Sequence, residues 1–439
     1  MALLAFLGIL LLCLFIRSFR IERAFKVLLY IYVVYWGMGI FFSSFGFYGI
    51  KEPGNYAQFL LLLHLFGFVL GVYFYSSINR QQKLAKNISN NDIGKEIESF
   101  LTSRLFWILF ALSFAYVLSL FQTYMTSLVF YGRSGEIRQN IEDIYGSFYK
   151  FYGNELLIQP IKILCFPLLS YALINRRILE TVVLGLYLVM EATLAGGRFG
   201  YAYIVVAFYF INVIILKANL KKYTPYFIVV ILLFFIASSY TKATRMGYTD
   251  FSINNIVENG MSANAEQIVT YYTGPMAAFD YSLKNNYIDK IGGLQYGALT
   301  FSPIILAIHT VGTLLNFDFH VPTVEVYELL EYNQVDIGAD HWNAFFTSVI
   351  YYYMDMGVVG VFVFPFLIGI LFSFLMKKLL LRPSVWIASI SCMFYIYLIK
   401  SEMKLEIISG KLFIVYIIYY LLGQRYMRNR KKHFKIEYK

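Results

Sequence analysis

The chain has 439 residues, of which 59% are hydrophobic, 19% aromatic and 14% charged. Apolar runs of about 18 residues or more, long enough to cross a hydrocarbon core of about 30 Å, recur throughout the chain and exclude a large soluble core. The formal net charge of +11 comes in short clusters between these runs, as in cytoplasmic loops, so the excess of Lys and Arg does not indicate a nucleic-acid partner.

The apolar runs predict an all-α polytopic membrane protein with about eleven transmembrane helices. The expected spans are Met1–Ile16, Val27–Gly49, Tyr56–Tyr75, Leu105–Phe130, Leu156–Leu173, Leu179–Ala195, Tyr201–Leu216, Pro225–Tyr240, Val358–Met376, Val385–Ile399 and Leu412–Gly423. Lys and Arg collect in every second connection, which places the amino end outside and the basic tail, residues 425–439, in the cytoplasm. The first span lacks a basic leading region and a cleavage site, so we expect it to be retained.

One long acidic loop divides the spans. Residues 1–240 are expected to form a membrane bundle of eight spans, 241–357 an external loop, and 358–424 the last three spans. The stretch Thr241–Asp355 holds twelve Asp or Glu against four Lys or Arg, and a loop of this length is usually functional. We expect its apolar run Leu299–Leu315 to be a re-entrant or interfacial helix, and the inner loop Ser76–Ser103 to be a linker.

Basic side chains are scarce on the expected outer face, which makes the few that occur there candidates for anion binding. Arg133 and Arg138 follow the fourth span, Arg198 lies in the glycine-rich turn after the sixth, and Lys242 and Arg245 follow the eighth. A planar guanidinium pairs with two phosphate oxygens, so this set suits the phosphate or pyrophosphate headgroup of a lipid-linked substrate. The alternative is that each arginine anchors a helix end at the membrane interface.

A second group of candidates precedes the ninth span. Read as one helix, Asn343, Thr347, Tyr351 and Asp355 lie four residues apart and form a polar stripe that leads to a carboxylate at the membrane. Asp340 and His341 would begin this helix. His, Asp and Glu are the side chains best suited to exchange protons. Asp340 could instead be an N-cap and His341 an ordinary loop histidine.

Further polar residues have more than one interpretation. Glu191 could pair with Arg198 inside the bundle, and Lys162 could make a similar pair or extend to the interface. Asp280 could contact a sugar or cap a helix. His64 lies in an apolar span, where a core position is expected.

Several motifs are absent from the sequence. It has no Walker motif, no glycine-rich dinucleotide turn, no paired Cys and His set and no Asp-X-Asp of a metal-bound nucleotide-sugar donor. We therefore expect neither a metal nor a cofactor, and an already activated, lipid-linked substrate would supply the energy.

Two stretches resemble a known family. The pattern YYTGPMAAFD, Tyr271–Asp280, and the stretch Asn343–Gly369 resemble the bacterial oligosaccharide repeat unit polymerases, which are the Wzy-type O-antigen and capsule polymerases. The outer arginines, the number of spans and the late external loop are also similar. The resemblance covers most of the chain as architecture, whereas only Asn343–Gly369 is specific.

This resemblance implies a lipid-phosphate-dependent, GT-C-like glycosyltransferase of the bacterial inner membrane. It would transfer a growing glycan from undecaprenyl pyrophosphate to a sugar hydroxyl of an incoming lipid-linked repeat unit. Arg198 and Arg245 would hold the donor pyrophosphate, and Arg133 and Arg138 one of the lipid headgroups. The base would be one of three residues: His341, Asp340 or Asp355.

The resemblance also implies partners. These are undecaprenyl-pyrophosphate-linked oligosaccharides, membrane lipid and a chain-length regulator protein. Two other functions stay open from the sequence: an O-antigen ligase and a lipid-linked oligosaccharide flippase or other transporter. Transporters usually have repeated halves and charged or broken helices within the membrane, whereas the charges here gather at one face and in one loop.

Overall fold

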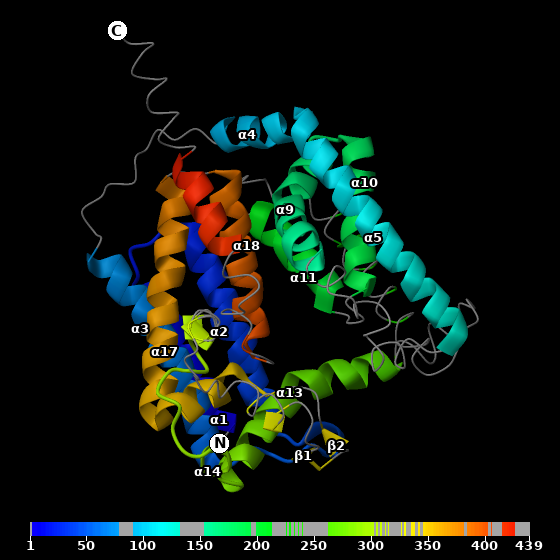
Figure 1. Cartoon of the computed structure of the whole chain (residues 1–439). Helices are drawn as coiled ribbons and strands as arrows, with labels where there is room; N and C mark the ends of the chain where they lie inside the picture. The colour runs from blue at the N-terminus through cyan, green and yellow to red at the C-terminus, as the bar shows by residue number, and fades with distance from the viewer. Residues whose placement is uncertain are drawn as a thin grey trace. The chain divides into compact units, whose positions relative to one another are not determined.

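The computed structural model describes residues 2–78, 91–131, 153–194, 199–212, 262–302, 335–338, 346–381, 384–402 and 415–425, with isolated positions between 225 and 342 and residue 405. Nearly all of these residues are helical (Figure 1). The expectation of an all-α protein is therefore confirmed for the part of the chain that is described.

Fourteen helical segments lie within the described part of the chain. They are α1 (Ala2–Arg17), α2 (Arg23–Ser43), η1 (Phe47–Gly49), α3 (Asn55–Ile78), α4 (Asn91–Thr102), α5 (Arg104–Tyr131), η2 (Asn154–Ile158), α9 (Gln159–Ile174), α10 (Ile178–Leu194), α11 (Phe199–Phe210), α13 (Ser262–Lys284), α14 (Tyr287–Lys290), α17 (Ser348–Leu381) and α18 (Val385–Lys400). Two short antiparallel strands, β1 (Val335–Asp336) and β2 (His341–Trp342), pair with Val335 opposite Trp342.

Four of these helices are long and apolar enough to cross a membrane: Arg23–Ser43, Asn55–Ile78, Arg104–Ser127 and Ser348–Leu381. Shorter apolar helices occupy Ala2–Arg17, Gln159–Ile174, Gly200–Phe210 and Val385–Lys400. Each overlaps an expected span, so the length and composition of the described helices suggest a membrane protein. Most of the expected span Pro225–Tyr240 lies outside the described residues, and the number eleven stays a prediction.

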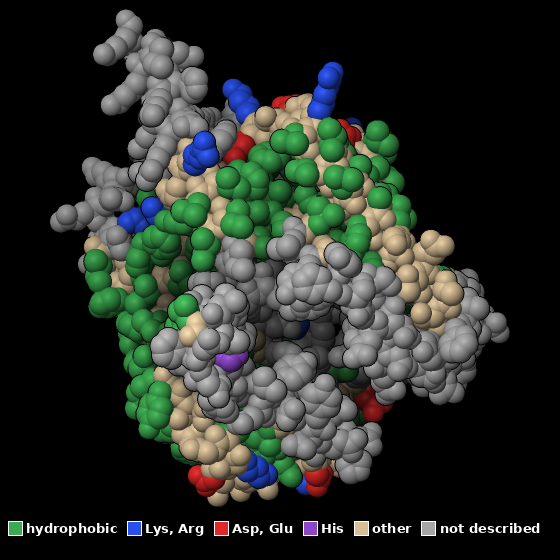
Figure 2. Space-filling view, in the orientation of Figure 1, with side chains coloured by type: hydrophobic (Ala, Val, Ile, Leu, Met, Phe, Trp, Pro, Cys, Tyr) green, Lys and Arg blue, Asp and Glu red, His purple; other side chains and the backbone are tan. Residues whose placement is uncertain are grey.

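Hydrophobic side chains cover broad areas of the described surface (Figure 2). On α5, for example, Leu105, Ile108 and Leu112 are 66%, 58% and 57% exposed. Such extensive exposed apolar surface is unusual for a soluble monomer and is expected where helices face lipid.

The chain divides into two compact units that do not follow the order of the sequence. Unit 1 comprises residues 1–85, 266–377 and 397–414, and unit 2 comprises 86–265, 378–396 and 415–439. Unit 1 thus combines α1, α2 and α3 with residues 266–357 of the expected external loop and with most of α17.

Within unit 1, glycines allow α3 and α17 to pack closely. Gly67 and Gly71 have the Gly-x-x-x-Gly spacing of close helix pairs in membranes, and a Cβ atom at Gly67 would lie 2.6 Å from the Phe362 carbonyl oxygen. Gly71 faces the Phe366 carbonyl in the same way, and Gly369 of α17 faces the Phe68 carbonyl of α3. Figure 1 shows α2, α3 and α17 running side by side.

Segments from the expected external loop pack onto the helix ends of unit 1. The Lys51 amide donates to the Ile337 carbonyl at 2.6 Å, and the Lys51 ammonium pairs with Asp336 at 2.7 Å. Between residues 299 and 315, Phe301, Ile304 and Ile308 expose apolar side chains three and four residues apart. Exposed apolar residues at this spacing are typical of one face of an interfacial helix, and the interfacial or re-entrant position expected for Leu299–Leu315 stays a prediction.

In unit 2, the inner loop differs from its predicted form. Part of the expected linker Ser76–Ser103 is the amphipathic helix α4, which buries Ile93, Ile97 and Leu101 at four-residue spacing. The Glu96 carboxylate of α4 accepts a hydrogen bond from the Val385 amide at 3.1 Å. The linker prediction was wrong for this part of the loop, because the apolar positions among its charged residues have a helical period.

Candidate functional site

The expected ninth span is part of a broken helix. The helix α17 begins at Ser348 and is interrupted at Met356 and Gly357, where the φ angle of Gly357 is +58°. The carbonyl groups of Met354 and Asp355, which precede the interruption, accept hydrogen bonds from the amides of Gln295 and Tyr296 at 3.0 and 2.8 Å. The loop thus satisfies the backbone groups that the break leaves without helical partners, as a break at membrane depth requires.

The polar stripe predicted before this span is only partly helical. Tyr351 and Asp355 lie in α17, but Thr347 precedes the helix and its hydroxyl accepts a hydrogen bond from the Val349 amide at 3.2 Å. His341 lies in β2 and not at the start of a helix, so the prediction of one helix from this position to Asp355 was wrong. Local side-chain and strand hydrogen bonds hold this segment outside the helix.

Asp355 is fully buried and holds the turn at residues 299–300. Its Oδ1 accepts a hydrogen bond from the Leu299 amide at 3.0 Å, and its Oδ2 accepts from the Thr300 amide at 2.8 Å and the Thr300 hydroxyl at 2.5 Å. Both oxygens are therefore engaged by donors of the loop. This geometry gives Asp355 a positioning function next to the helix break, and its predicted function as a base stays untested.

A second buried carboxyl group, which the sequence analysis did not select, lies close by in unit 1. Glu402 follows the end of α18 and has no exposed surface. It lies against Gly39 of α2, where an added Cβ atom would collide with Oε1. Neither carboxyl oxygen has a well-formed hydrogen bond or a cationic partner in the described part of the chain.

Tyrosines surround this carboxyl group. The Tyr35 hydroxyl of α2 interacts with it, and the Tyr272 hydroxyl of α13 donates a hydrogen bond to the Tyr35 carbonyl. Burial raises the pKa of Glu402 well above its usual range, and the Tyr35 hydroxyl offsets only part of this effect. Burial likewise raises the pKa of Tyr272, and a negative charge on Glu402 raises it further. A carboxyl group in this environment can exchange a proton at a higher pH than an exposed one.

His64 lies in an aromatic group beside this carboxyl group. Its Nε2 atom is 3.1 Å from the Tyr32 hydroxyl, and its ring lies 4.5 Å from the Trp36 ring and 5.8 Å from the Tyr352 ring. The predicted core position of His64 is confirmed, since the residue is only 2% exposed.

Within the described part of the chain, several buried polar atoms of this region make no well-formed hydrogen bond. They are Trp36 Nε1, His64 Nδ1, Ser348 Oγ, Tyr352 Oη and both carboxyl oxygens of Glu402. A backbone hydrogen bond joins the start of α17 to the segment after α18: the Ser348 amide donates to the Ser401 carbonyl at 2.8 Å. Buried polar atoms are nearly always hydrogen-bonded in proteins, so their concentration here makes this region a candidate site. We call Gly39, Tyr35, His64, Tyr352 and Glu402 the buried carboxyl cluster.

The cluster lies toward one end of the helices of unit 1. Gly39 is in the last turns of α2, Tyr352 in the first turns of α17, and Glu402 directly after α18. The basic residues Arg17–Lys26 and Lys377–Lys378 are at the opposite ends of these helices. If the basic ends face the cytoplasm, as the positive-inside rule predicts, the cluster is on the outer side.

Asp280 is also in unit 1, in α13. It is 7% exposed, forms an ion pair with Lys284 at 2.5 Å, and lies against Gly54, where an added Cβ atom would be 3.0 Å from Oδ1. It lies four residues before the last residue of α13, Lys284, and therefore not at a cap position of this helix. The Lys284 side chain is largely exposed, so the ion pair joins the buried carboxylate of Asp280 to a cation at the surface.

Unit 2 contains a buried ion pair between α9 and α10. The Lys162 ammonium lies 2.7 Å from both Glu191 oxygens, with the side chains 11% and 7% exposed. Gln159 donates to Glu191 at 3.4 Å. Lys162 is therefore the observed partner of Glu191 and does not extend to the interface.

The remaining predicted residues lie outside the described residues. They are Arg133, Arg138, Arg198, Lys242, Arg245, Asp340 and Asn343, together with the side chain of His341. Their convergence on a phosphate group stays a prediction. Among the residues that are described, no three His, Cys, Asp or Glu side chains gather closely enough to hold a metal ion.

No family model, no curated protein and no solved structure matches the chain.

Proposed function

We propose that this protein polymerises undecaprenyl-pyrophosphate-linked oligosaccharide repeat units on the outer face of the bacterial inner membrane. It would be a glycosyltransferase of the repeat unit polymerase type, with GT-C-like architecture, and O-antigen or capsule would be its product. The resemblance of Tyr271–Asp280 and Asn343–Gly369 and the outer arginines support this proposal. The structural observation that carries it is the buried carboxyl group of Glu402 at the loop-covered end of unit 1.

The reaction needs a proton acceptor. The acceptor hydroxyl oxygen would attack the anomeric carbon of the donor glycan, the bond from this carbon to the pyrophosphate oxygen would break, and the hydroxyl proton would pass to a base. General bases work best when their pKa is near the working pH, and burial moves the pKa of Glu402 in that direction. Among the described residues its oxygens have no well-formed hydrogen bond, whereas donors of the loop occupy those of Asp355.

We therefore add Glu402 to His341, Asp340 and Asp355 as a candidate base. Because Glu402 is fully buried, an acceptor sugar reaches it only when residues 401–402 separate from Gly39. The outer arginines would stabilise the charge that develops on the leaving pyrophosphate. Removing one such preorganised group typically lowers the rate by about 10²–10³.

A deletion strain tests the class of function. Loss of a polymerase leaves surface glycan of a single repeat unit, whereas loss of a ligase leaves long lipid-linked polymer. Complementation with Glu402→Gln, Arg198→Ala or Arg245→Ala should each fail to restore the ladder while membrane protein levels stay normal. Long surface chains in the deletion strain would exclude the proposal.

Two observations favour a transporter of lipid-linked oligosaccharide as a second candidate. Broken helices and ionisable residues inside the membrane are typical of transporters, and α17 is broken beside Asp355 while Lys162 and Glu191 pair inside unit 2. The leaflet that holds the accumulated lipid-linked repeat unit in the deletion strain separates the two functions. Accumulation in the inner leaflet indicates a transporter, and accumulation in the outer leaflet indicates the polymerase.

A further inference from the structure

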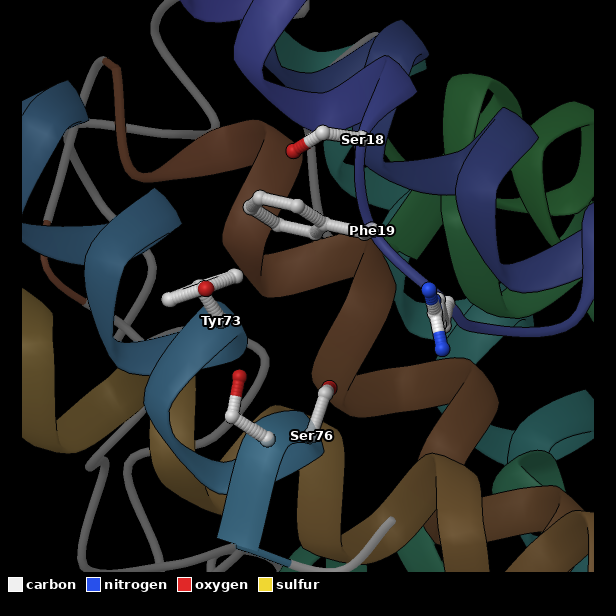
Figure 3. Close-up of a pocket in the computed structure, with 6 residues that line it drawn as sticks. Ser18, Phe19, Tyr73 and Ser76 are labelled. Carbon is white, nitrogen blue, oxygen red and sulfur yellow. The ribbon is translucent and has the colours of Figure 1, made fainter.

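A cavity of about 240 Å³ lies at the basic end of unit 1, far from the buried carboxyl cluster along the helices. It is lined by Ser18, Phe19, Arg20, Tyr73, Ser76 and Ser77. The first three residues connect α1 to α2, and the other three are in the last turns of α3 (Figure 3). The proposed function does not use this cavity.

Aromatic rings close one side of the cavity. Phe19 is 3% exposed, and its ring centroid lies 5.0 Å from that of Phe15 and 5.1 Å from that of Tyr73. Figure 3 shows the Phe19 ring between Ser18 and Tyr73. These contacts fix the connection between α1 and α2 against α3, so the cavity has a rigid wall.

The rest of the lining is polar and carries one positive charge. Ser18 and Ser76 donate their hydroxyl protons to the carbonyl groups of Phe15 and Val72, both at 2.7 Å. Because the Ser18 and Ser76 protons already go to backbone carbonyls, the charged group of the lining that fits a phosphate is the Arg20 guanidinium, which has no ion pair among the described residues.

Exposed apolar stripes run from this cavity along both helices. On α3, Phe66 and Phe59 lie seven and fourteen residues before Tyr73, on the same helical face, and are 42% and 54% exposed. On α1, Leu7, Leu10 and Leu14 lead toward Ser18 and are 42%, 45% and 53% exposed. A polar cavity at the end of apolar, exposed stripes has the form of a phospholipid: a headgroup followed by acyl chains.

We propose that this cavity binds the headgroup of an anionic phospholipid, with its phosphate on Arg20 and its acyl chains along the exposed stripes of α1 and α3. Anionic lipids are attracted to basic segments at the membrane surface, and Arg17, Arg23 and Lys26 add to the local positive charge. Only Arg20 of this group lines the cavity. The positive-inside rule predicts that the lipid belongs to the cytoplasmic leaflet.

Native mass spectrometry of the full chain tests the proposal, with phosphatidylglycerol and phosphatidylcholine of matched acyl chains as probes. We expect phosphatidylglycerol to bind more tightly than phosphatidylcholine. Arg20→Gln should weaken phosphatidylglycerol binding tenfold or more, whereas Arg17→Gln, the matched control, should weaken it no more than about fivefold, the effect of one basic residue near the surface. Ser77→Val should weaken it without changing any charge.

Three results would overturn the proposal. Equal losses for the Arg17 and Arg20 variants would show diffuse attraction to the basic cluster. Equal binding of both lipids would show that the phosphate charge is not recognised. Displacement of phosphatidylglycerol by millimolar inorganic phosphate would show that the site binds free phosphate and not a lipid.

Discussion

The carboxyl group of Glu402 occupies space that exists only because residue 39 is glycine. An added Cβ atom at Gly39 would collide with Glu402 Oε1 and would lie 2.7 Å from the Met276 methyl group. The two residues come from α2 and from the segment after α18, so this contact closes unit 1 around the buried carboxyl cluster.

Gly39→Ala should therefore destabilise the protein by about 1–3 kcal/mol, which is the usual cost of overpacking a core. The Met276 side chain can move, but the Glu402 backbone is held by the neighbouring contact between Ser348 and Ser401. Thermal unfolding in detergent measures the change. In the double variant with Glu402→Ala, much of the loss should be recovered, because the colliding oxygen is gone. Additive losses in the double variant would show that the two residues do not interact.

Glu402 should also make stability depend on pH. Its pKa is raised in the folded protein by burial, while in the unfolded chain it returns to about 4.5. The folded state therefore holds the proton longer, and the stabilising contribution is complete below pH 4.5 and is lost as pH rises toward the folded pKa. Tyr272, which faces it, has its own pKa raised by burial and therefore stays neutral in this window.

Unfolding of wild type and Glu402→Gln, measured from pH 4.5 upward, checks this sign. Relative to the Gln variant, wild type should lose stability as the pH rises. Glu266→Gln is the control, because this glutamate is exposed on α13 and its removal should leave the pH dependence unchanged. Parallel pH curves for wild type and Glu402→Gln would show that the carboxyl group does not retain its proton on folding.

The sequence predicted the helices better than it predicted the buried carboxyl cluster. Apolar runs located α2, α3 and α5, because a membrane span needs one long, continuous run of apolar residues. His64 was correctly placed in the core. Glu402, in contrast, lies in the charged sequence KSEMKLE and resembles an exposed loop residue. Its burial depends on Gly39 from a distant helix, and such a tertiary contact has no local pattern. A glutamate within two residues of an apolar span was the one available signal.

The close packing of α3 on α17 gives a prediction about glycine. Gly71→Ala should destabilise unit 1 by about 1–3 kcal/mol, because the new methyl group would meet the Phe366 carbonyl, which is backbone and cannot rotate away. Gly185→Ala in α10 is the control, because its Cβ atom would meet only Leu169 at 4.0 Å. At this position alanine should leave stability unchanged or raise it by up to about 1 kcal/mol through its higher helix propensity. Equal melting temperatures for the two variants would contradict the close contact.

Asp355 gives the prediction that separates a positioning function from a catalytic one. Asn at this position keeps one acceptor oxygen but turns an amide donor toward the Leu299 or Thr300 amide, so a hydrogen bond is lost and a donor is left buried. Since hydrogen bonds to charged groups contribute about 1.5–3 kcal/mol each, Asp355→Asn should lower the melting temperature clearly. Thr300→Val removes one donor and leaves the carboxylate in place, so it should cause a smaller loss of the same kind.

Glycan ladders of both variants, recorded beside their melting temperatures, complete the comparison. If Asp355 positions the loop, Thr300→Val should shorten the ladder in proportion to its loss of stability, because Gln295 and Tyr296, which precede the turn at 299–300 in the same loop, donate to carbonyl groups at the broken end of α17. If Asp355 is the base, Asp355→Asn should abolish polymerisation while Thr300→Val leaves it intact. Since donors of the loop occupy both carboxylate oxygens, we expect the first result, and proton transfer then depends on Glu402 or on the residues at 340–341.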